Sequence, residues 1–249
     1  MTKIYGHRGS KGTYPENTLL SFQKAIESGV EGLELDVHMT KDGEIVVIHD
    51  ETLERTTNGA GSIKDLTLAE LKQYSTGVKF NTFANYTQSW DEERIPTLQE
   101  VLELLKHTNI ELNIELKTYI HTYPGIERKL VNIVHEYAGE RRVVYSSFHL
   151  PSLIRLKQED NDAQIALLLN QLISNPLDYI DTFDLESIHI DKDLILHDPY
   201  HFFKELAPKL RVWTVNEEEE MKKLLQLGVE AIITDYPEMA ISLATTVNQ

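Results

Sequence analysis

Short apolar segments alternate with amphipathic segments along the whole chain, and this alternation constrains the fold more than any other feature. It is the pattern of βα units around a parallel sheet. Strands are expected at residues 4–5, 32–37, 111–116, 143–146, 165–169, 187–190, 212–215 and 232–234. Helices are expected at 18–28, 98–106, 125–137, 150–158, 171–179, 200–206, 217–227 and 237–245. Eight strands, each followed by a helix, predict an α/β fold of the closed TIM (β/α)8 type in a single domain over residues 1–249. An open doubly wound sheet is the alternative.

The segment between residues 44 and 96 interrupts this alternation. It contains a strand-like run at 44–48, a glycine-rich turn at 58–61, a short helical stretch at 68–74, and aromatic and polar residues up to Trp90. Because it is too short to bury a core of its own, we expect a small insertion after the second strand, at approximately residues 50–95. Loops at the carboxyl ends of barrel strands carry active sites, so the insertion is expected to cover the pocket.

Charge and composition exclude several classes of partner. The 24 basic and 40 acidic residues give a formal charge of −16, which disfavours nucleic acid, although a small phosphate ester can bind in a locally positive pocket. There is no cysteine, so any metal must be held by oxygen or histidine. The N-terminal residues lack the apolar core of a signal peptide, and no apolar run approaches the roughly 20 residues that span a bilayer. We therefore expect a cytoplasmic protein without stable membrane insertion.

Two of the expected strands carry charges on one face. Glu34 and Asp36 are two residues apart in the second strand, and Glu115 and Lys117 have the same spacing in the third. Successive side chains of a strand point to opposite sides, so each pair projects in one direction. Unpaired buried carboxylates cost several kcal/mol, and a bound metal is the natural counterion. The alternative is that both pairs are ordinary surface charges at strand ends.

Histidines occur at the ends of two expected strands. The first strand ends in His7-Arg8 between two glycines, and the extra strand of the insertion ends in His49-Asp50. Imidazole titrates near neutral pH, so the two histidines are candidates for an acid and a base. The guanidinium of Arg8 can bind two phosphate oxygens. Asp50 is expected either to orient His49 or to cap the following turn.

These residues belong to a set of motifs that resembles the glycerophosphodiester phosphodiesterase family. The likeness covers essentially the whole chain and is densest in the first 60 residues. The motifs are His7-Arg8-Gly9, Pro15-Glu16-Asn17-Thr18, Glu34-Leu35-Asp36-Val37, Thr40-Lys41-Asp42-Gly43, His49-Asp50, Arg55-Thr56-Thr57, Ile114-Glu115-Leu116-Lys117 and Trp213-Thr214-Val215-Asn216. The resemblance implies a TIM barrel and metal-dependent cleavage of a glycerophosphodiester, a small-molecule substrate, to glycerol 3-phosphate and an alcohol.

The resemblance also implies a role for each candidate residue. It implies that Glu34, Asp36 and Glu115 are metal ligands, that His7 and His49 are the acid and the base, and that Arg8 and Lys117 contact phosphate. A set of oxygen ligands favours Mg²⁺ or Ca²⁺ over zinc. Trp213, with Phe148 and Tyr119, is expected to supply apolar walls for the glycerol carbons, unless these aromatic residues belong to the core.

Two other functions remain open at this point. A related barrel could cleave a lysophospholipid in the manner of a phospholipase D. A strongly apolar insertion would then be expected, but residues 58–90 are more polar than such an insertion. The chain could also be a binding protein that holds a phosphodiester without turnover. The presence of both His7 and His49 argues against the second possibility, because binding alone needs neither.

Overall fold

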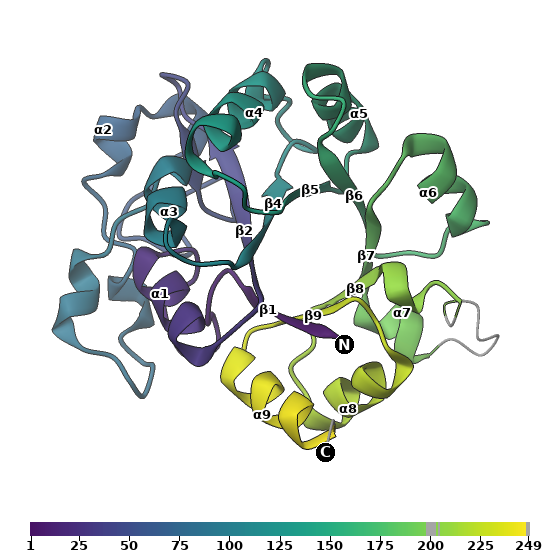
Figure 1. The fold of residues 1–249 in the computed structure, drawn as a ribbon. Helices are drawn as coiled ribbons and strands as arrows, with labels where there is room; N and C mark the ends of the chain where they lie inside the picture. The colour runs from purple at the N-terminus through teal and green to yellow at the C-terminus, as the bar shows by residue number, and fades with distance from the viewer. Residues whose placement is uncertain (198–202, 204, 248–249) are drawn as a thin grey trace.

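A closed ring of parallel strands forms the centre of the computed structural model, which describes residues 1–197, 203 and 205–247 (Figure 1). The strand β1 (Lys3–His7) pairs with both β2 (Gly32–Met39) and β9 (Ala231–Thr234), and this double pairing closes the ring. The other members are β4 (Glu111–Leu116), β5 (Val143–Ser147), β6 (Gln164–Leu169), β7 (Ser187–Asp191) and β8 (Leu210–Trp213). The predicted TIM barrel is confirmed and the open doubly wound sheet is wrong, because an open sheet would leave β1 paired on one side only.

Helices cover the outside of the ring, as Figure 1 shows. They are α1 (Leu19–Ser28), α3 (Leu98–Leu105), α4 (Ile126–Tyr137), α5 (Leu150–Glu159), α6 (Pro176–Phe183), α7 (Lys192–Leu196), α8 (Glu218–Leu227) and α9 (Pro237–Val247). The short helix α2 (Leu68–Leu71) belongs to the insertion. The short 3₁₀ helices are η1 (Ile63–Asp65), η2 (Val78–Phe80), η3 (Gln88–Glu92) and η4 (Ala207–Lys209). The helix α6 begins later than the expected 171, at Pro176, because proline fits the first helical turn. Most of the helix expected at 200–206 lies outside the described residues.

The apolar core lies between the ring and the helices. Leu33, Leu35 and Leu116 belong to this core and are completely buried. Their neighbours Glu34 and Asp36 alternate with them along β2 and therefore point to the interior of the barrel. The period-two pattern of these strands thus separates the apolar packing face from the face that carries charge.

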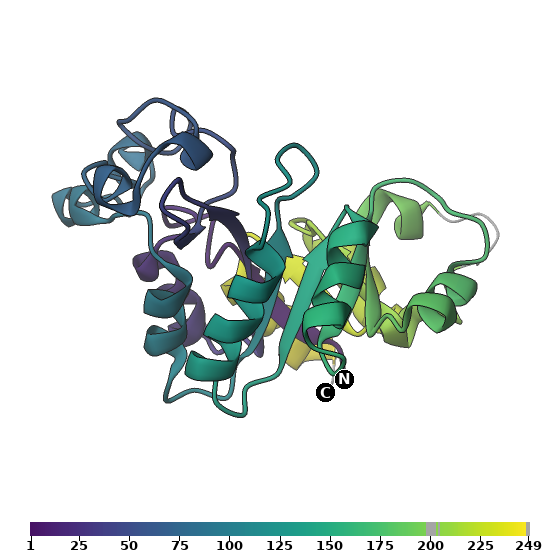
Figure 2. The same ribbon diagram turned by 90° about the horizontal axis from the view of Figure 1, so that it is seen from above.

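The insertion stands beside the carboxyl ends of the strands, as Figure 2 shows. Its first element, β3 (Ile45–Val47), pairs antiparallel with β2 and lies outside the ring. It also buries a small apolar cluster, although the segment was expected to be too short for a core of its own. The members of the cluster are Val46, Ile48, Leu53, Ile63, Leu71 and Ile95. This cluster holds the polar end of β3, where His49 and Asp50 follow, against the barrel mouth.

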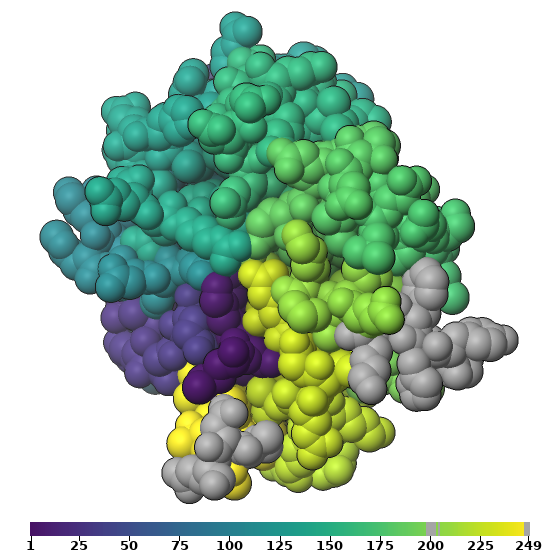
Figure 3. All heavy atoms as spheres, turned by 45° about the vertical axis from the view of Figure 1, so that its right-hand side comes forward, coloured from purple at the N-terminus to yellow at the C-terminus, as the bar shows by residue number. Residues whose placement is uncertain are grey.

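A buried charge cluster closes the opposite end of the barrel. The guanidinium of Arg211 is fully buried; it donates to the hydroxyl of Tyr5 at 2.9 Å and to carboxylate oxygens of Glu186 at 3.0 Å and Glu230 at 3.1 Å. Two of these partners, Tyr5 and Glu230, belong to the two end segments of the chain, which meet in Figure 3 where the purple N-terminal segment touches the yellow C-terminal one. Among the described helices, we find none with the length and apolar character needed to cross a bilayer.

Candidate active site

A cavity of about 110 Å³ lies at the carboxyl ends of the barrel strands. Its lining includes most of the residues that the sequence singles out, namely His7, Arg8, Glu34, His49, Glu115, Lys117 and Trp213. The remaining candidate, Asp36, lies beside them in a buried acidic cluster. The structure therefore brings all the candidate residues together at the barrel mouth, where TIM barrels carry their sites.

The acidic cluster consists of Glu34, Asp36 and Glu115. Each of the three offers one carboxylate oxygen, and these oxygens lie within 4.8 Å of one another. Strand register produces the cluster, because Asp36 in β2 is directly opposite Glu115 in the neighbouring β4. All three side chains are buried, at 4%, 0% and 8% exposure. They are inside the barrel, so the alternative of ordinary surface charges is wrong.

Two cations offset part of this negative charge. The ammonium of Lys117 lies 2.6 Å from Glu115 Oε1 and 3.0 Å from Asp36 Oδ1, while Arg8 Nε lies 3.1 Å from Asp36 Oδ2. Burial opposes the ionisation of Asp36, but Lys117 and Arg8 outweigh it and hold the pKa of this carboxyl well below its usual range. Asp36 is thus an ionised oxygen donor between two cations.

Glu34 is in the opposite situation. Burial raises its pKa well above the usual range, and the nearby negative charges of Asp36 and Glu115 add to the effect. Three carboxylates face only two cations here, so the cluster lacks positive charge. A divalent cation fits this shortage, because oxygen donors at close range are the ligands that hard cations prefer. The residues present therefore suit a bound Mg²⁺ or Ca²⁺.

His7 is paired with a carboxylate that directly follows the last strand of the ring. Its Nδ1 lies 2.6 Å from Asp235 Oδ1, and its Nε2 lies 3.9 Å from Glu34 Oε2. An ionised carboxylate only accepts hydrogen bonds, so Nδ1 carries the proton and Nε2 is directed to the acidic cluster. Burial and the Arg8 cation lower the pKa of His7 to about 4, against the opposing effect of Asp235. Asn216 in turn donates to Asp235 Oδ2 at 2.9 Å.

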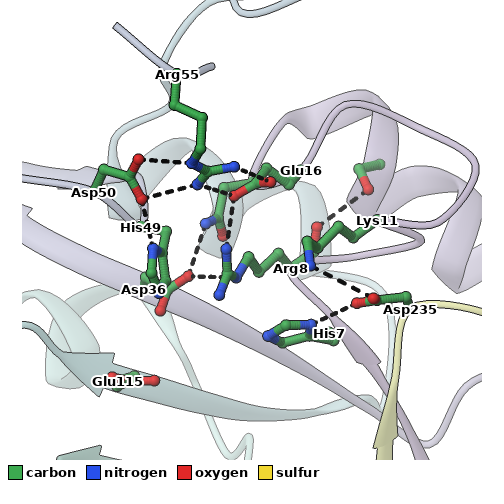
Figure 4. A network of polar contacts seen from close by, with 12 residues as sticks. His7, Arg8, Lys11, Glu16, Asp36, His49, Asp50, Arg55, Glu115 and Asp235 are labelled. Carbon is green, nitrogen blue, oxygen red and sulfur yellow. Dashed lines mark hydrogen bonds and ion pairs between the residues drawn. The ribbon is translucent and has the colours of Figure 1, made fainter. Parts of the chain in front are cut away.

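His49 has the same kind of partner on the other side of the site (Figure 4). Its Nδ1 lies 2.7 Å from Asp50 Oδ1, so Asp50 orients the imidazole. Arg55 donates to both oxygens of Asp50, at 2.9 and 2.6 Å, and to both oxygens of Glu16, at 2.8 Å each. Glu16 also accepts from Arg8 at 2.8 Å. A continuous chain of charged contacts therefore joins the insertion to the phosphate-binding candidate Arg8, directly after β1.

Aromatic side chains form a row on the far side of the cavity. Trp213 and Phe148 both line the cavity, with their rings 5.7 Å apart and edge to face. Phe148 also meets Tyr119 edge to face, at 6.3 Å between ring centres. Tyr119 is 50% exposed, so this member of the row lies outside the barrel core.

Four residues of the site were not singled out as functional in the sequence. Asp235 follows the last strand directly, and a carboxylate immediately after a barrel strand is a signal that could have found it. Glu16 and Arg55 occur in quoted motifs, yet only the fold reveals that they contact each other. Asn17 donates to Asp36 Oδ2 at 2.9 Å, while its neighbour Thr18 caps α1.

Comparison with known proteins gives consistent matches over nearly the whole chain. Residues 7–239 match the model of the glycerophosphoryl diester phosphodiesterase family. The chain is 42% identical to a glycerophosphodiester phosphodiesterase of Caldanaerobacter subterraneus subsp. tengcongensis, with 97% of both chains covered. It is 40% identical to one of Bacillus altitudinis, with 98% of both covered. A phosphodiesterase of Oleispira antarctica, solved in complex with the product sn-glycerol-3-phosphate, has a TM-score of 0.87 and 29% identity over 98% of this chain and 97% of that one.

Proposed function

The chain belongs to the glycerophosphoryl diester phosphodiesterase family and is a phosphoric diester hydrolase; from that premise we propose that it cleaves glycerophosphodiesters by a metal-dependent, acid–base mechanism at the barrel mouth. The products are glycerol 3-phosphate and an alcohol. The observation that carries this proposal is the buried cluster of three carboxylates, which two cations do not neutralise. Among the alternatives, binding without turnover gains no support from relatives that are named as phosphodiesterases. Lysophospholipid cleavage is likewise not favoured by these matches.

Glu34, Asp36 and Glu115 would hold the cation. When bound, a divalent cation supplies Lewis-acid stabilisation of the charge that develops on the phosphoryl oxygens. Because the donors are all carboxylate oxygens, Mg²⁺ and Ca²⁺ are the appropriate ions. Release of the cation would leave three buried carboxylates in mutual repulsion, so metal binding and folding stability are expected to be linked.

Arg8 and Lys117 bind and orient the phosphodiester. Both line the cavity, and only 11% of the Arg8 side chain and 3% of the Lys117 side chain is exposed, which strengthens their attraction for an anion. Arg8 presents a planar set of donors suited to two phosphate oxygens, whereas Lys117 acts as a point charge. Together they allow an anionic substrate to bind a protein whose formal charge is −16.

His7 and His49 move the protons. In each residue Nδ1 donates to a carboxylate, Asp235 or Asp50, which leaves Nε2 for proton exchange with the reacting groups. One histidine accepts the proton of the nucleophile, either water or a neighbouring glycerol hydroxyl, and the other donates a proton to the departing alkoxide. The paired carboxylates hold both rings in a fixed tautomer and orientation.

The experiment that tests the proposal combines turnover with stability. The purified protein is assayed for release of glycerol 3-phosphate from glycerophosphocholine, before and after chelation and after Mg²⁺ or Ca²⁺ is restored. We expect activity to disappear with chelator and to return with the metal. A cation at 100 times its dissociation constant adds about 2.7 kcal/mol of stability, so the melting temperature should fall on chelation.

Two variants make the result specific. Glu34→Gln should abolish both the metal-dependent shift in melting temperature and most of the activity, because it removes a ligand. Glu103→Gln, which changes an exposed carboxylate on α3, should leave both unchanged. Undiminished turnover in chelator, with identical melting curves, would contradict the metal assignment.

A further inference from the structure

A second hollow of about 610 Å³ lies beside the catalytic cavity, above the carboxyl end of β6. Its lining includes Tyr119, Phe148, Leu150, Leu168 and Tyr179, and none of its described lining residues is charged. We call it the β6 groove. Large apolar hollows on a protein surface commonly bind an apolar group. The metal and phosphate candidates described above lie in the cavity beside it.

The groove is continuous with the catalytic cavity. Phe148 and Leu168 line both hollows. The aromatic row runs from Trp213 in the cavity, through Phe148, to Tyr119 in the groove. A phosphate substituent that extends from the cavity toward the aromatic row is therefore in contact with apolar side chains along its length.

Exposed apolar side chains extend the groove at the rim. Tyr119 and Ile120, which follow β4, are 50% and 58% exposed, and Leu172 and Leu177, around the start of α6, are 65% and 48% exposed. Figure 2 shows the loop after β4 rising above the barrel mouth. Side chains this exposed contribute little to the stability of the free protein. They would shield an apolar chain that lies between the loop after β4 and the loop before α6 from water.

The floor of the catalytic cavity has the opposite character. Asn113 and His189 line it and are 1% and 0% exposed. Asn113 Oδ1 and His189 Nε2 have no hydrogen-bond partner among the described residues. Buried polar atoms need partners, and the hydroxyl groups of a glycerol moiety would supply them. Glycerol hydroxyl groups on this polar floor leave Trp213, which lines the cavity only, available to the glycerol carbons, and direct the other phosphate substituent, the leaving alcohol, toward Phe148 and Tyr119.

We infer that the β6 groove is the subsite of the leaving alcohol and that it takes alcohols with an alkyl chain. This inference rests on the proposed function, because it needs a phosphodiester bound between the acidic cluster and the aromatic row. The neutral lining offers no ionic partner to anionic or zwitterionic head groups, and each methylene that enters the groove leaves water.

A series of glycerophosphodiesters with methanol, propanol and hexanol as leaving alcohols tests the inference. Alcohols of similar acidity have similar intrinsic reactivity, so kcat/KM reports mainly on binding along the chain. We expect kcat/KM to rise about three- to fourfold per methylene until the groove is filled. Hydrolysis of the methyl ester alone reports on the proposed function, so loss of all activity and loss of the chain-length trend are distinguishable.

Tyrosine-to-aspartate variants inside and outside the groove show where the chain-length trend in kcat/KM originates. Tyr119→Asp and Tyr179→Asp place a charge in the groove from two different elements and should flatten the chain-length trend. Tyr137→Asp changes a tyrosine at the end of α4 that is 41% exposed and outside the groove, and it should keep the trend. Thermal melts establish that each variant is folded, and the use of two groove positions protects the test against the failure of one.

Three results would overturn the inference. The first is a flat series in the unmodified protein. The second is a preference for choline over its neutral isostere 3,3-dimethylbutanol, which would assign the groove to a quaternary ammonium by cation–π attraction. The third is a response to acyl chains on the glycerol side only.

Discussion

Asp235→Asn is the substitution that examines the proposed proton transfer most closely without touching a histidine. Asp235 Oδ1 accepts from His7 Nδ1 at 2.6 Å inside a largely buried site, which makes this a charge-assisted hydrogen bond. Such bonds contribute about 1.5–3 kcal/mol. At 1.36 kcal/mol per tenfold in rate, their loss should lower kcat about 10- to 150-fold. The KM should change little, because the proposed phosphate contacts, Arg8 and Lys117, are not altered.

The assay compares kcat and KM for glycerophosphocholine with the melting temperature of the same samples. A second variant, Asp235→Asn with Asn216→Asp, exchanges the amide and the carboxylate that now face each other at 2.9 Å. In the single variant the amide nitrogen of Asn216 draws the new amide oxygen at position 235 to itself, so an N–H group faces His7. With a carboxylate at position 216, the amide at position 235 donates to that carboxylate and turns its oxygen to His7, so part of the lost rate should return. An unchanged kcat in the single variant would refute the reasoning, and so would a double variant no faster than the single one.

Three further predictions concern the phosphate contacts, the histidines and the closed end of the barrel. Lys117→Met and Arg8→Met should each raise the barrier by about 2.7–4 kcal/mol, measured as kcat/KM with saturating divalent cation. Under that condition the melting temperature should change little, because the cation offsets the carboxylates that each variant leaves unpaired; loss of soluble protein in both would mean a structural role. Of His7→Ala and His49→Ala, the variant that lacks the general acid should fail on a choline ester but recover on a nitrophenyl diester, because a phenolate departs without a proton. The recovery should be part of the about 10²- to 10⁴-fold in rate that acid–base assistance provides. Equal defects of both variants on both substrates would contradict the division of roles. Arg211→Met should destabilise the fold by about 3–5 kcal/mol in denaturant titration, because Glu186 and Glu230 lose their buried partner, while kcat stays constant; a parallel loss of kcat would contradict the separation of this cluster from the site.

The barrel could be predicted from the sequence because each of its strands is recognisable from local sequence alone. Each strand is a short apolar run, and the count of such runs is a property of the chain alone. The ends of strands are less local: β8 was expected at 212–215, but its pairing with β7 covers Leu210–Trp213. Register against a neighbour sets this boundary, and register is not visible within one segment.

The site likewise contains contacts that local sequence spacing predicts and contacts that it does not. The two-residue spacing of Glu34 and Asp36 predicts a shared face, and the structure brings both to Glu115 as expected. The contact of His7 with Asp235 spans 228 residues and exists only because β1 closes the ring against β9. The contact of Arg55 with Glu16 spans 39 residues and depends on how the insertion lies on the rim. Neither distance follows from local spacing.

The phosphorus spectrum of a reaction with glycerophosphocholine tests the central claim most directly, because it identifies which bond is cleaved. In the presence of Mg²⁺ or Ca²⁺, the diester signal should be replaced by that of glycerol 3-phosphate, and with chelator it should persist. Formation of phosphocholine in place of glycerol 3-phosphate, or an equal rate of conversion in chelator, would contradict the account of metal-dependent release of the alcohol at this site.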